Sequence, residues 1–238
     1  MRKLLLFVAL CLVIAVPAFA DIVIGNPPDQ GTGNCFPFGC AYTTNYQQVY
    51  SHTQFGGAIL ITGLEFFNTQ VDNGANMMNS GTWTISLSTS ANNWNTLSST
   101  FSQNLGGDNT QVFKGNLSQS WAFGDILTIN LSTPFLYDPS KGNLLMTVDA
   151  EGTSDPAGGI YFDTNGYDNG NFDGNTFLGR VYCNGCGQTT GTVNNGYGLV
   201  TGFITSGGGG QTPEPSSLLL MSTGLVGMVG FLRRKMNR

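Results

Sequence analysis

The feature that most constrains the fold is the alternation of apolar and polar side chains over short runs. In residues 82–89 (TWTISLST), Trp83, Ile85 and Leu87 fall on one side of an extended chain, and threonines and serines fall on the other. Residues 125–133 (DILTINLST) repeat the pattern. A period of two is typical of a β-strand with one buried face. Both runs therefore predict strands.

Other parts of residues 21–205 have the same character. Further short runs predict strands: QQVYS, GAILITGLEFFN, GNLLMTVDA, GGIYFD, FLGRVYC and YGLVTGFI. Gly, Asn, Asp and Pro lie in the segments between these runs. Residues 137–143 (YDPSKGN) predict a tight turn, in which Pro139 presets φ and Gly142 allows a positive φ. Only residues 91–103 show a weak helical pattern. We therefore predict an all-β fold, a two-sheet β-sandwich that is jelly-roll-like.

The charge of this body excludes one class of partner. Between residues 21 and 210 there are three basic residues, Lys114, Lys141 and Arg180, against thirteen acidic ones, a net charge near minus ten. Nucleic acid is excluded, because phosphate binding needs clustered Lys and Arg. Disorder is disfavoured by the 16 Phe and 8 Tyr of the chain.

The first twenty residues predict export. Arg2 and Lys3 precede an apolar run from Leu4 to Val16, and Ala18-Phe19-Ala20 has the A-x-A form of a cleavage site. This pattern is typical of a secretory signal peptide. We expect residues 1–20 to be removed and the mature chain to begin at Asp21; an uncleaved anchor is the alternative.

Four cysteines remain after that cleavage: Cys35, Cys40, Cys183 and Cys186. An even number in an oxidising compartment predicts disulfides, and four cysteines allow three connectivities. Local pairs would close small loops, and cross pairs would join the front of the domain to its back. A zinc site and a redox C-x2-C motif are the alternatives.

The last part of the chain predicts a linker and a membrane segment. Residues 206–212 are a glycine-rich linker, and the sorting or anchor segment spans 213–238. Within it, residues 216–232 are an apolar stretch of 17 residues, a little short of the roughly 20 that span a bilayer as a helix. The basic residues that follow can snorkel and hold their end in the cytoplasm.

The three parts of this segment resemble the PEP-CTERM sorting signal. The motif is Pro213, Glu214 and Pro215, the apolar helix follows, and a basic stop ends it: Arg233, Arg234, Lys235 and Arg238. The resemblance implies processing by an exosortase, a transient inner-membrane anchor, and release or transfer to the cell surface or exopolysaccharide matrix of a Gram-negative bacterium. Residues 33–67 and 134–148 also look like segments of such ectodomains, which are mostly β-sandwiches without a known activity.

Catalysis has little support in the sequence. His52 is the only histidine of the chain, and neither a G-x-S-x-G elbow nor an H-E-x-x-H motif accompanies it. Glu65 and Glu151 are the two glutamates of the body, and a glycosidase would need a pair of carboxylates. We expect no enzyme, with a hydrolase as an alternative.

One loop is rich in the oxygen ligands that calcium prefers. Its candidates are Asp163, Asn165, Asp168 and Asp173, with Asn169 and Asn171 between them. The EF-hand template fails, because its twelfth position is Arg180 rather than Glu. Asx turns of a hairpin explain the same residues. No other cofactor is expected.

Two tryptophans are candidates for stacking on sugar rings, Trp94 and Trp121, because both lie beside polar residues. Trp83 alternates with apolar neighbours and is expected in the core. The sequence thus predicts an exported surface or matrix protein with a structural or adhesive role, whose partners are an exosortase, the membrane and exopolysaccharide. A carbohydrate-binding module is the alternative.

Overall fold

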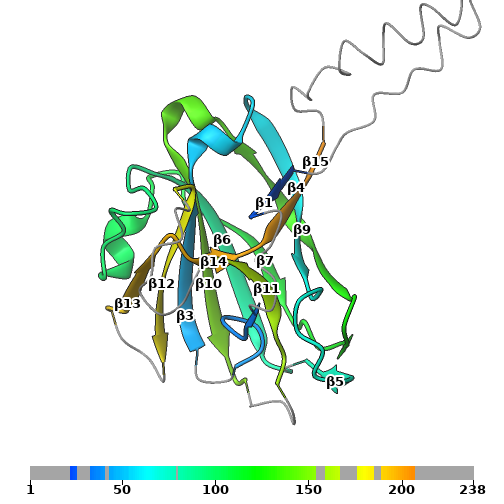
Figure 1. Cartoon of the computed structure of the whole chain (residues 1–238). Helices are drawn as coiled ribbons and strands as arrows, with labels where there is room; N and C mark the ends of the chain where they lie inside the picture. The colour runs from blue at the N-terminus through cyan, green and yellow to red at the C-terminus, as the bar shows by residue number, and fades with distance from the viewer. Residues whose placement is uncertain are drawn as a thin grey trace, which may run out of the picture.

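A computed structural model describes residues 22–25, 33–40, 43–78, 80–153, 159–166, 176–184 and 189–206 (Figure 1). Within these ranges the fold is all-β, as predicted, and the helical elements are three short 3-10 turns: η1 (His52–Gln54), η2 (Phe101–Asn104) and η3 (Pro139–Lys141).

The strands form two larger and two smaller sheets, and their pairings are antiparallel. The four-stranded sheet has the order β1 (Ile22–Ile24), β15 (Thr201–Thr205), β4 (Ile59–Phe67), β9 (Ile126–Tyr137). The six-stranded sheet has the order β13 (Thr192–Asn195), β12 (Leu178–Asn184), β3 (Thr43–Tyr50), β10 (Asn143–Glu151), β6 (Thr82–Ser90), β7 (Thr110–Gly115). The small sheets are β14 (Gly198–Leu199), β11 (Phe162–Asn165), β2 (Gly33–Asn34), and β5 (Asn76–Met77) with β8 (Ser120–Trp121).

The two larger sheets face each other across one core. Apolar side chains from β4, β9 and β15 belong to the same buried cluster as those from β3, β6 and β10. The ring of Tyr50 on β3 meets that of Phe203 on β15 edge-on, with centroids 5.0 Å apart. The Tyr50 hydroxyl also lies 2.8 Å from the Thr201 hydroxyl. The period-two alternation explains this arrangement, because it gives each strand one apolar face that a second sheet must cover.

A turn closed by a disulfide contributes a buried aromatic side chain to this core. Cys35 and Cys40 are bonded, with their Cα atoms 5.3 Å apart. Between them, the fully buried Phe38 ring packs against Phe66 on β4 and Trp83 on β6. The bridge therefore holds an aromatic side chain between the two sheets.

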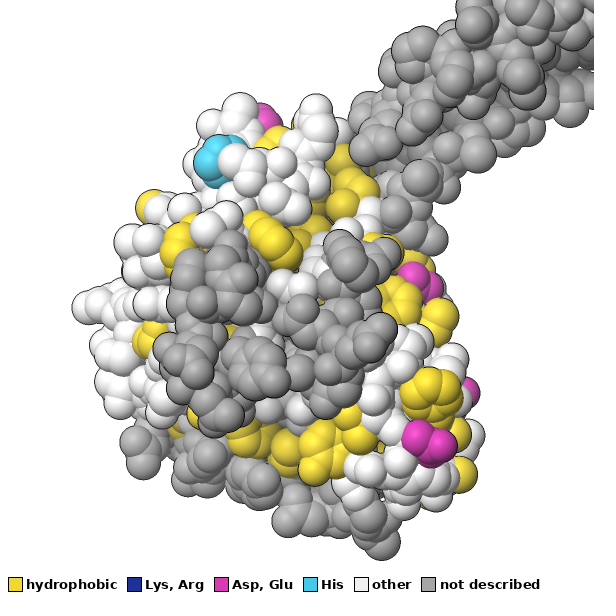
Figure 2. Space-filling view, viewed as in Figure 1, with side chains coloured by type: hydrophobic (Ala, Val, Ile, Leu, Met, Phe, Trp, Pro, Cys, Tyr) yellow, Lys and Arg dark blue, Asp and Glu magenta, His cyan; other side chains and the backbone are white. Residues whose placement is uncertain are grey.

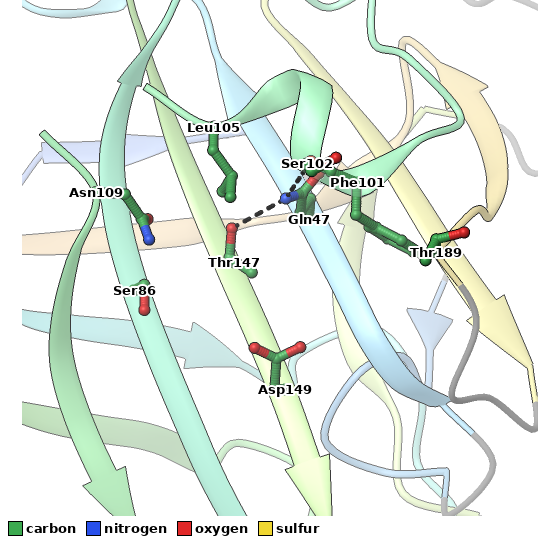
Figure 3. A pocket seen from close by; sticks show the side chains of 9 residues that line it. All are labelled: Gln47, Ser86, Phe101, Ser102, Leu105, Asn109, Thr147, Asp149 and Thr189. Atoms are coloured by element: carbon green, nitrogen blue, oxygen red, sulfur yellow. Dashed lines mark hydrogen bonds between the residues drawn. The ribbon is translucent and has the colours of Figure 1, made fainter. Parts of the chain in front are cut away.

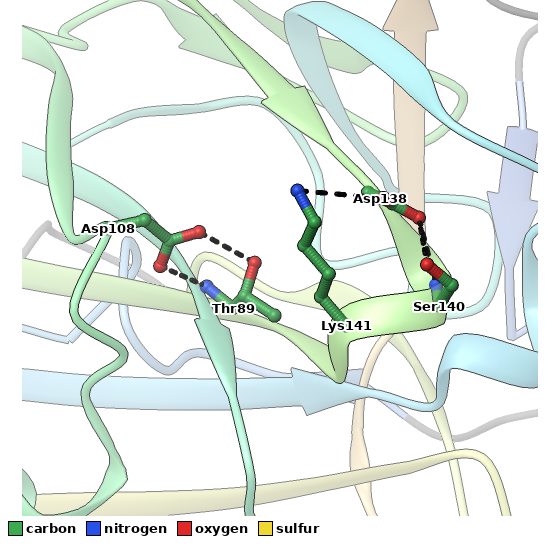
Figure 4. Close-up of polar contacts among 5 residues, drawn as sticks. All are labelled: Thr89, Asp108, Asp138, Ser140 and Lys141. Carbon is green, nitrogen blue, oxygen red and sulfur yellow. Dashed lines mark hydrogen bonds and ion pairs between the residues drawn. The ribbon is translucent and has the colours of Figure 1, made fainter.

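Polar turns close the strands at one end of the six-stranded sheet (Figure 4). Asp138 caps η3 by accepting hydrogen bonds from the Ser140 amide and hydroxyl, and Lys141 lies 3.6 Å from its carboxylate. Gly142 follows with φ of 149°, so the predicted turn over residues 137–143 is confirmed. Asp108 accepts from Thr89 with both of its carboxylate oxygens, one from the backbone N–H and the other from the hydroxyl.

The structure corrects the secondary-structure prediction in two places. Residues 91–103 form turns and the start of η2 rather than a helix, because Asn104 ties the segment back on itself by accepting from the Ser98 amide and donating to its carbonyl. Six of the described strands were not predicted, because they are short or carry no clear alternation: β1, β2, β5, β7, β8 and β13. Backbone pairing with a neighbouring strand places them in the sheets instead.

Candidate functional site

A groove of about 300 Å³ lies on the face of the six-stranded sheet that points away from the core. Nine residues line it: Gln47, Ser86, Phe101, Ser102, Leu105, Asn109, Thr147, Asp149 and Thr189 (Figure 3). They come from β3, β6 and β10, and from the loops that cross above these strands. The groove thus has a floor of three paired strands and walls that come from loops.

Strand register assembles the floor. Gln47 on β3 is paired with Thr147 on β10, and Thr147 is paired with Ser86 on β6. Asp149 lies two positions further along β10, on the same face. Their neighbours along each strand point into the core, so these polar side chains must point outward.

Gln47 fastens one wall to this floor. Its side-chain nitrogen donates to the Phe101 carbonyl at 3.1 Å and to the Thr147 hydroxyl at 3.2 Å. Its side-chain oxygen accepts from the side-chain nitrogen of Asn104 at 2.9 Å. Gln47 is almost fully buried by the loop that it holds. The wall formed by η2 is therefore positioned whether or not the groove is filled.

The floor also offers hydrogen-bonding capacity that the described residues do not use. One Asp149 oxygen accepts from the Asn45 amide at 2.5 Å, and the hydrogen bonds described for this part of the chain leave the other oxygen available. The same holds for the Ser86 hydroxyl and the Asn109 carboxamide at the groove surface. Burial raises the pKa of Asp149 above its ordinary value, the Asn45 hydrogen bond opposes this, and the nearby charge of Glu151 adds to it.

This arrangement is suited to binding polar, uncharged groups. The lining combines amide, hydroxyl and carboxylate oxygens with the Phe101 ring and the Leu105 side chain. It contains a single ionisable side chain, so the described lining lacks the second group of an acid–base pair.

The catalytic candidates from the sequence are not brought together. Glu65 points outward from β4 on the four-stranded sheet, where it accepts a 3.5 Å hydrogen bond from Thr128. Glu151 lies at the end of β10 on the outer face of the other sheet. The core separates these two faces, so Glu65 and Glu151 do not form a carboxylate pair.

His52 lies apart from both glutamates. It is exposed in η1, and its ring Nδ1 and backbone N–H both lie within 3.1 Å of the Asn143 side-chain oxygen. The partner described for the His52 ring is thus the Asn143 carboxamide, and neither Glu65 nor Glu151 is among its hydrogen-bond partners.

Two of the four calcium candidates, Asp163 and Asn165, lie within the described residues. Asp163 is buried and accepts hydrogen bonds from the Thr69 amide, the Thr69 hydroxyl and the Gln70 amide. Asn165 donates to the Gly25 carbonyl at 3.3 Å. These contacts give both side chains a structural role that needs no cation. Asp168 and Asp173 lie outside the described residues, so the calcium site stays a prediction. In the ranges described, no three His, Cys, Asp or Glu side chains gather into a cation site.

The two tryptophan candidates have different surroundings. Trp121 is 2 % exposed, donates its indole N–H to the Tyr161 carbonyl at 2.9 Å and packs against Phe162. No ring face is open to a sugar, so this assignment was wrong. Trp94 is half-buried against Val49 and Leu145, and its stacking on a sugar ring stays a prediction. Trp83 is fully buried in the core, as expected.

The cysteine prediction is confirmed for the first pair. Cys35 and Cys40 are bonded to each other, which excludes a bridge from either of them to the back of the domain. Cys183 is also disulfide-bonded, and its partner lies outside the described residues, as does Cys186.

The predicted segments at both ends lie outside the described residues. These are the signal peptide at 1–20, most of the linker, and the sorting segment with Pro213, Glu214 and Pro215. No helix within the described ranges is long and apolar enough to cross a membrane, so the helix predicted at 216–232 stays a prediction.

The groove was missed by the sequence analysis. A signal was present in the outward positions of residues 142–150, where Thr147 and Asp149 alternate with core residues. It could not be used, because the partners Gln47 and Ser86 come from strands far away along the chain.

Comparison with known proteins gives one informative match. Residues 211–235 match the family model described as the PEP-CTERM protein-sorting motif. No curated protein matches the chain. A solved structure titled "Structure of infectious bursal disease virus Gx strain" aligns with 13 % identity over 90 % of this chain and 49 % of that chain. Its TM-score of 0.21 supports no inference about fold or function. The motif over residues 211–235 therefore identifies this chain as an exported protein that carries a PEP-CTERM signal for sorting by an exosortase at the membrane.

Proposed function

We propose that this protein is delivered by an exosortase to the cell surface or extracellular matrix of a Gram-negative bacterium, where its body has a structural or adhesive role. The observation that carries the proposal is the PEP-CTERM motif at residues 211–235. An exosortase would act on it while the apolar stretch at 216–232 serves as a transient inner-membrane anchor.

The surface chemistry of the body supports a non-catalytic role. Figure 2 shows a face on which uncharged polar and apolar side chains predominate, with few acidic groups among them. Of the three basic residues in the body, Arg180 is fully buried among the rings of Phe36, Tyr182 and Tyr197. Only Lys114 and Lys141 remain as surface cations. Such a surface is suited to contact with uncharged hydrated polymers.

The architecture is consistent with a durable extracellular module. Two facing antiparallel sheets share one core, and a disulfide braces the turn that holds Phe38. We propose that this body is a jelly-roll-like β-sandwich, joined by the linker at 206–212 to the sorting segment. Disulfides of this kind persist in oxidising compartments.

The test is the intact mass of the mature protein from its native host, with peptide mapping under non-reducing conditions. We expect a species that begins at Asp21 and ends near Pro213 to Pro215, in the surface or matrix fraction. A Glu214→Ala variant should stay in the membrane fraction, and Thr212→Ala, which leaves the Pro213-Glu214-Pro215 triplet intact, should be processed normally. A wild-type species that retains Arg238 would overturn the proposal.

A further inference from the structure

We infer that the groove on the outer face of the six-stranded sheet binds a segment of a neutral, hydroxyl-rich polysaccharide. In this site Asp149 and Ser86 form hydrogen bonds to sugar hydroxyls, and Phe101 and Leu105 contact the apolar faces of the sugar ring. The inference deepens the adhesive part of the proposed function by naming the ligand class. It rests on that proposed function only for the export that brings the protein to its ligand.

The first step is the match of hydrogen-bonding groups. A sugar hydroxyl donates one hydrogen bond and accepts others, so it pairs well with side chains that have unused donors and acceptors. The Ser86 hydroxyl both donates and accepts, the Asp149 carboxylate accepts, and the Asn109 carboxamide does both. These three line the same groove, and Figure 3 shows Ser86 and Asp149 on neighbouring strands of its floor.

The second step is the apolar wall. Phe101 is half-buried and Leu105 is 39 % exposed, and both line the groove opposite its polar floor. A sugar ring has C–H groups on its faces and hydroxyls around its rim. A groove with polar groups on one side and apolar carbon on the other is complementary to that shape, as small-ligand sites in general combine apolar walls with a few placed polar groups.

The third step is charge. Asp149 is the single charged side chain of the described lining, and Lys and Arg do not contribute to it. A phosphate, sulfate or uronate group would find no cation there and would be repelled by Asp149. The charge of the lining therefore disfavours an anionic ligand and is compatible with a neutral one.

The fourth step is preorganisation. The Gln47 amide holds the η2 wall through hydrogen bonds to Phe101 and Asn104. A wall that is already ordered loses little conformational entropy when the ligand binds. The volume of about 300 Å³ lies at the lower end for small-ligand pockets, as expected for a site that holds a short piece of a longer chain.

The experiment is affinity electrophoresis of the full chain, purified in a detergent without a sugar headgroup. The gels contain a neutral polysaccharide (dextran, galactomannan or mixed-linkage β-glucan) or the anionic alginate. Two variants alter the floor: Asp149→Ala removes an acceptor, and Ser86→Tyr fills the groove. Thr128→Tyr is the matched control, because Thr128 is exposed on the outer face of the four-stranded sheet.

We expect at least one neutral polysaccharide to retard the wild-type protein. Asp149→Ala and Ser86→Tyr should each weaken that binding by about tenfold or more, the loss associated with one good hydrogen bond to a charged group. The control should stay within about twofold of the wild type. If Ser86→Tyr does not fold, as judged by near-ultraviolet circular dichroism, Asp149→Ala and Asp149→Asn decide the question.

Three results would overturn the inference. These are no retardation by any neutral polysaccharide in the panel, retardation that both Asp149 variants leave unchanged, and stronger retardation by alginate that the same variants abolish. The binding assay uses purified protein, so its failure leaves the sorting proposal standing. Retention of the tail in the host, in turn, leaves this assay unaffected.

Discussion

Removal of the Asp163 carboxylate should release a loop from the body of the domain. Asp163 on β11 is 2 % exposed, and one of its oxygens accepts hydrogen bonds from the backbone N–H groups of Thr69 at 2.7 Å and Gln70 at 3.0 Å. The other oxygen accepts from the Thr69 hydroxyl at 2.6 Å. These bonds fasten the segment after β4 to a strand that lies more than ninety residues away.

The magnitude follows from the number of bonds and their exposure. A hydrogen bond to a charged group contributes about 1.5–3 kcal/mol net. Thr69 is exposed, so water can hydrogen-bond to some of the donors that Asp163→Ala leaves without a partner. We therefore expect the loss of all three bonds to lower the free energy of unfolding by about 3 kcal/mol. For a domain of this size that corresponds to a fall in Tm of about 6–12 °C. Thr69→Ala removes one bond and should cost about 1 kcal/mol.

The assay is urea unfolding of the purified mature protein with its disulfides intact. Asp163→Asn is the conservative control, because it keeps one oxygen for the two backbone donors and should recover most of the loss. The cost of Asp163→Ala should be the same with calcium and with EDTA, since hydrogen bonds occupy both carboxylate oxygens. A cost of Asp163→Ala no larger than that of Thr69→Ala would refute the reasoning, and a cost that appears only with calcium would show that Asp163 acts as a calcium ligand instead.

Three further predictions follow from buried groups. Burial raises the pKa of Asp149 above 3.8, because the folded state favours the protonated carboxyl. The stabilisation from this protonated form is fully present below that pH and is lost as pH rises. Asp149→Asn should therefore gain stability relative to the wild type between about pH 3 and pH 7 in urea titrations. Trp121→Phe should lower the unfolding free energy by about 1–2 kcal/mol through loss of the indole hydrogen bond, and it should leave polysaccharide retardation unchanged. Burial raises the pKa of Tyr46, Tyr50 and Tyr137 well above 10.0, so stability should fall as pH rises beyond that value, and absorbance should show these phenols ionising only as the protein unfolds.

The strands that alternate strictly could be predicted from the sequence. Trp83, Ile85 and Leu87 each lie in the core, and the turn that contains Pro139 and Gly142 is formed as expected. These features depend on residues within one short segment, whose local pattern is enough to specify them. Strands such as β7 depend on pairing with a partner, so their own residues carried too weak a signal.

The candidate sites were predicted less well because they depend on distant contacts. Asp163 looked like a calcium ligand in an Asx-rich run, and its partners Thr69 and Gln70 belong to another part of the chain. Trp121 lies beside polar residues in the sequence, yet the fold covers it with Phe162. Polar neighbours along the chain do not show which side of a strand is covered.

The sequence by itself determined the all-β class and the PEP-CTERM motif at residues 211–235. Both are contiguous patterns, one set by the period of two of an extended chain and the other by three adjoining parts of a signal. Only the tertiary structure decided that Cys35 bonds to Cys40, and that Gln47, Ser86 and Asp149 share one groove. The reason is the strand register, because pairing between segments far apart along the chain determines which outward side chains become neighbours.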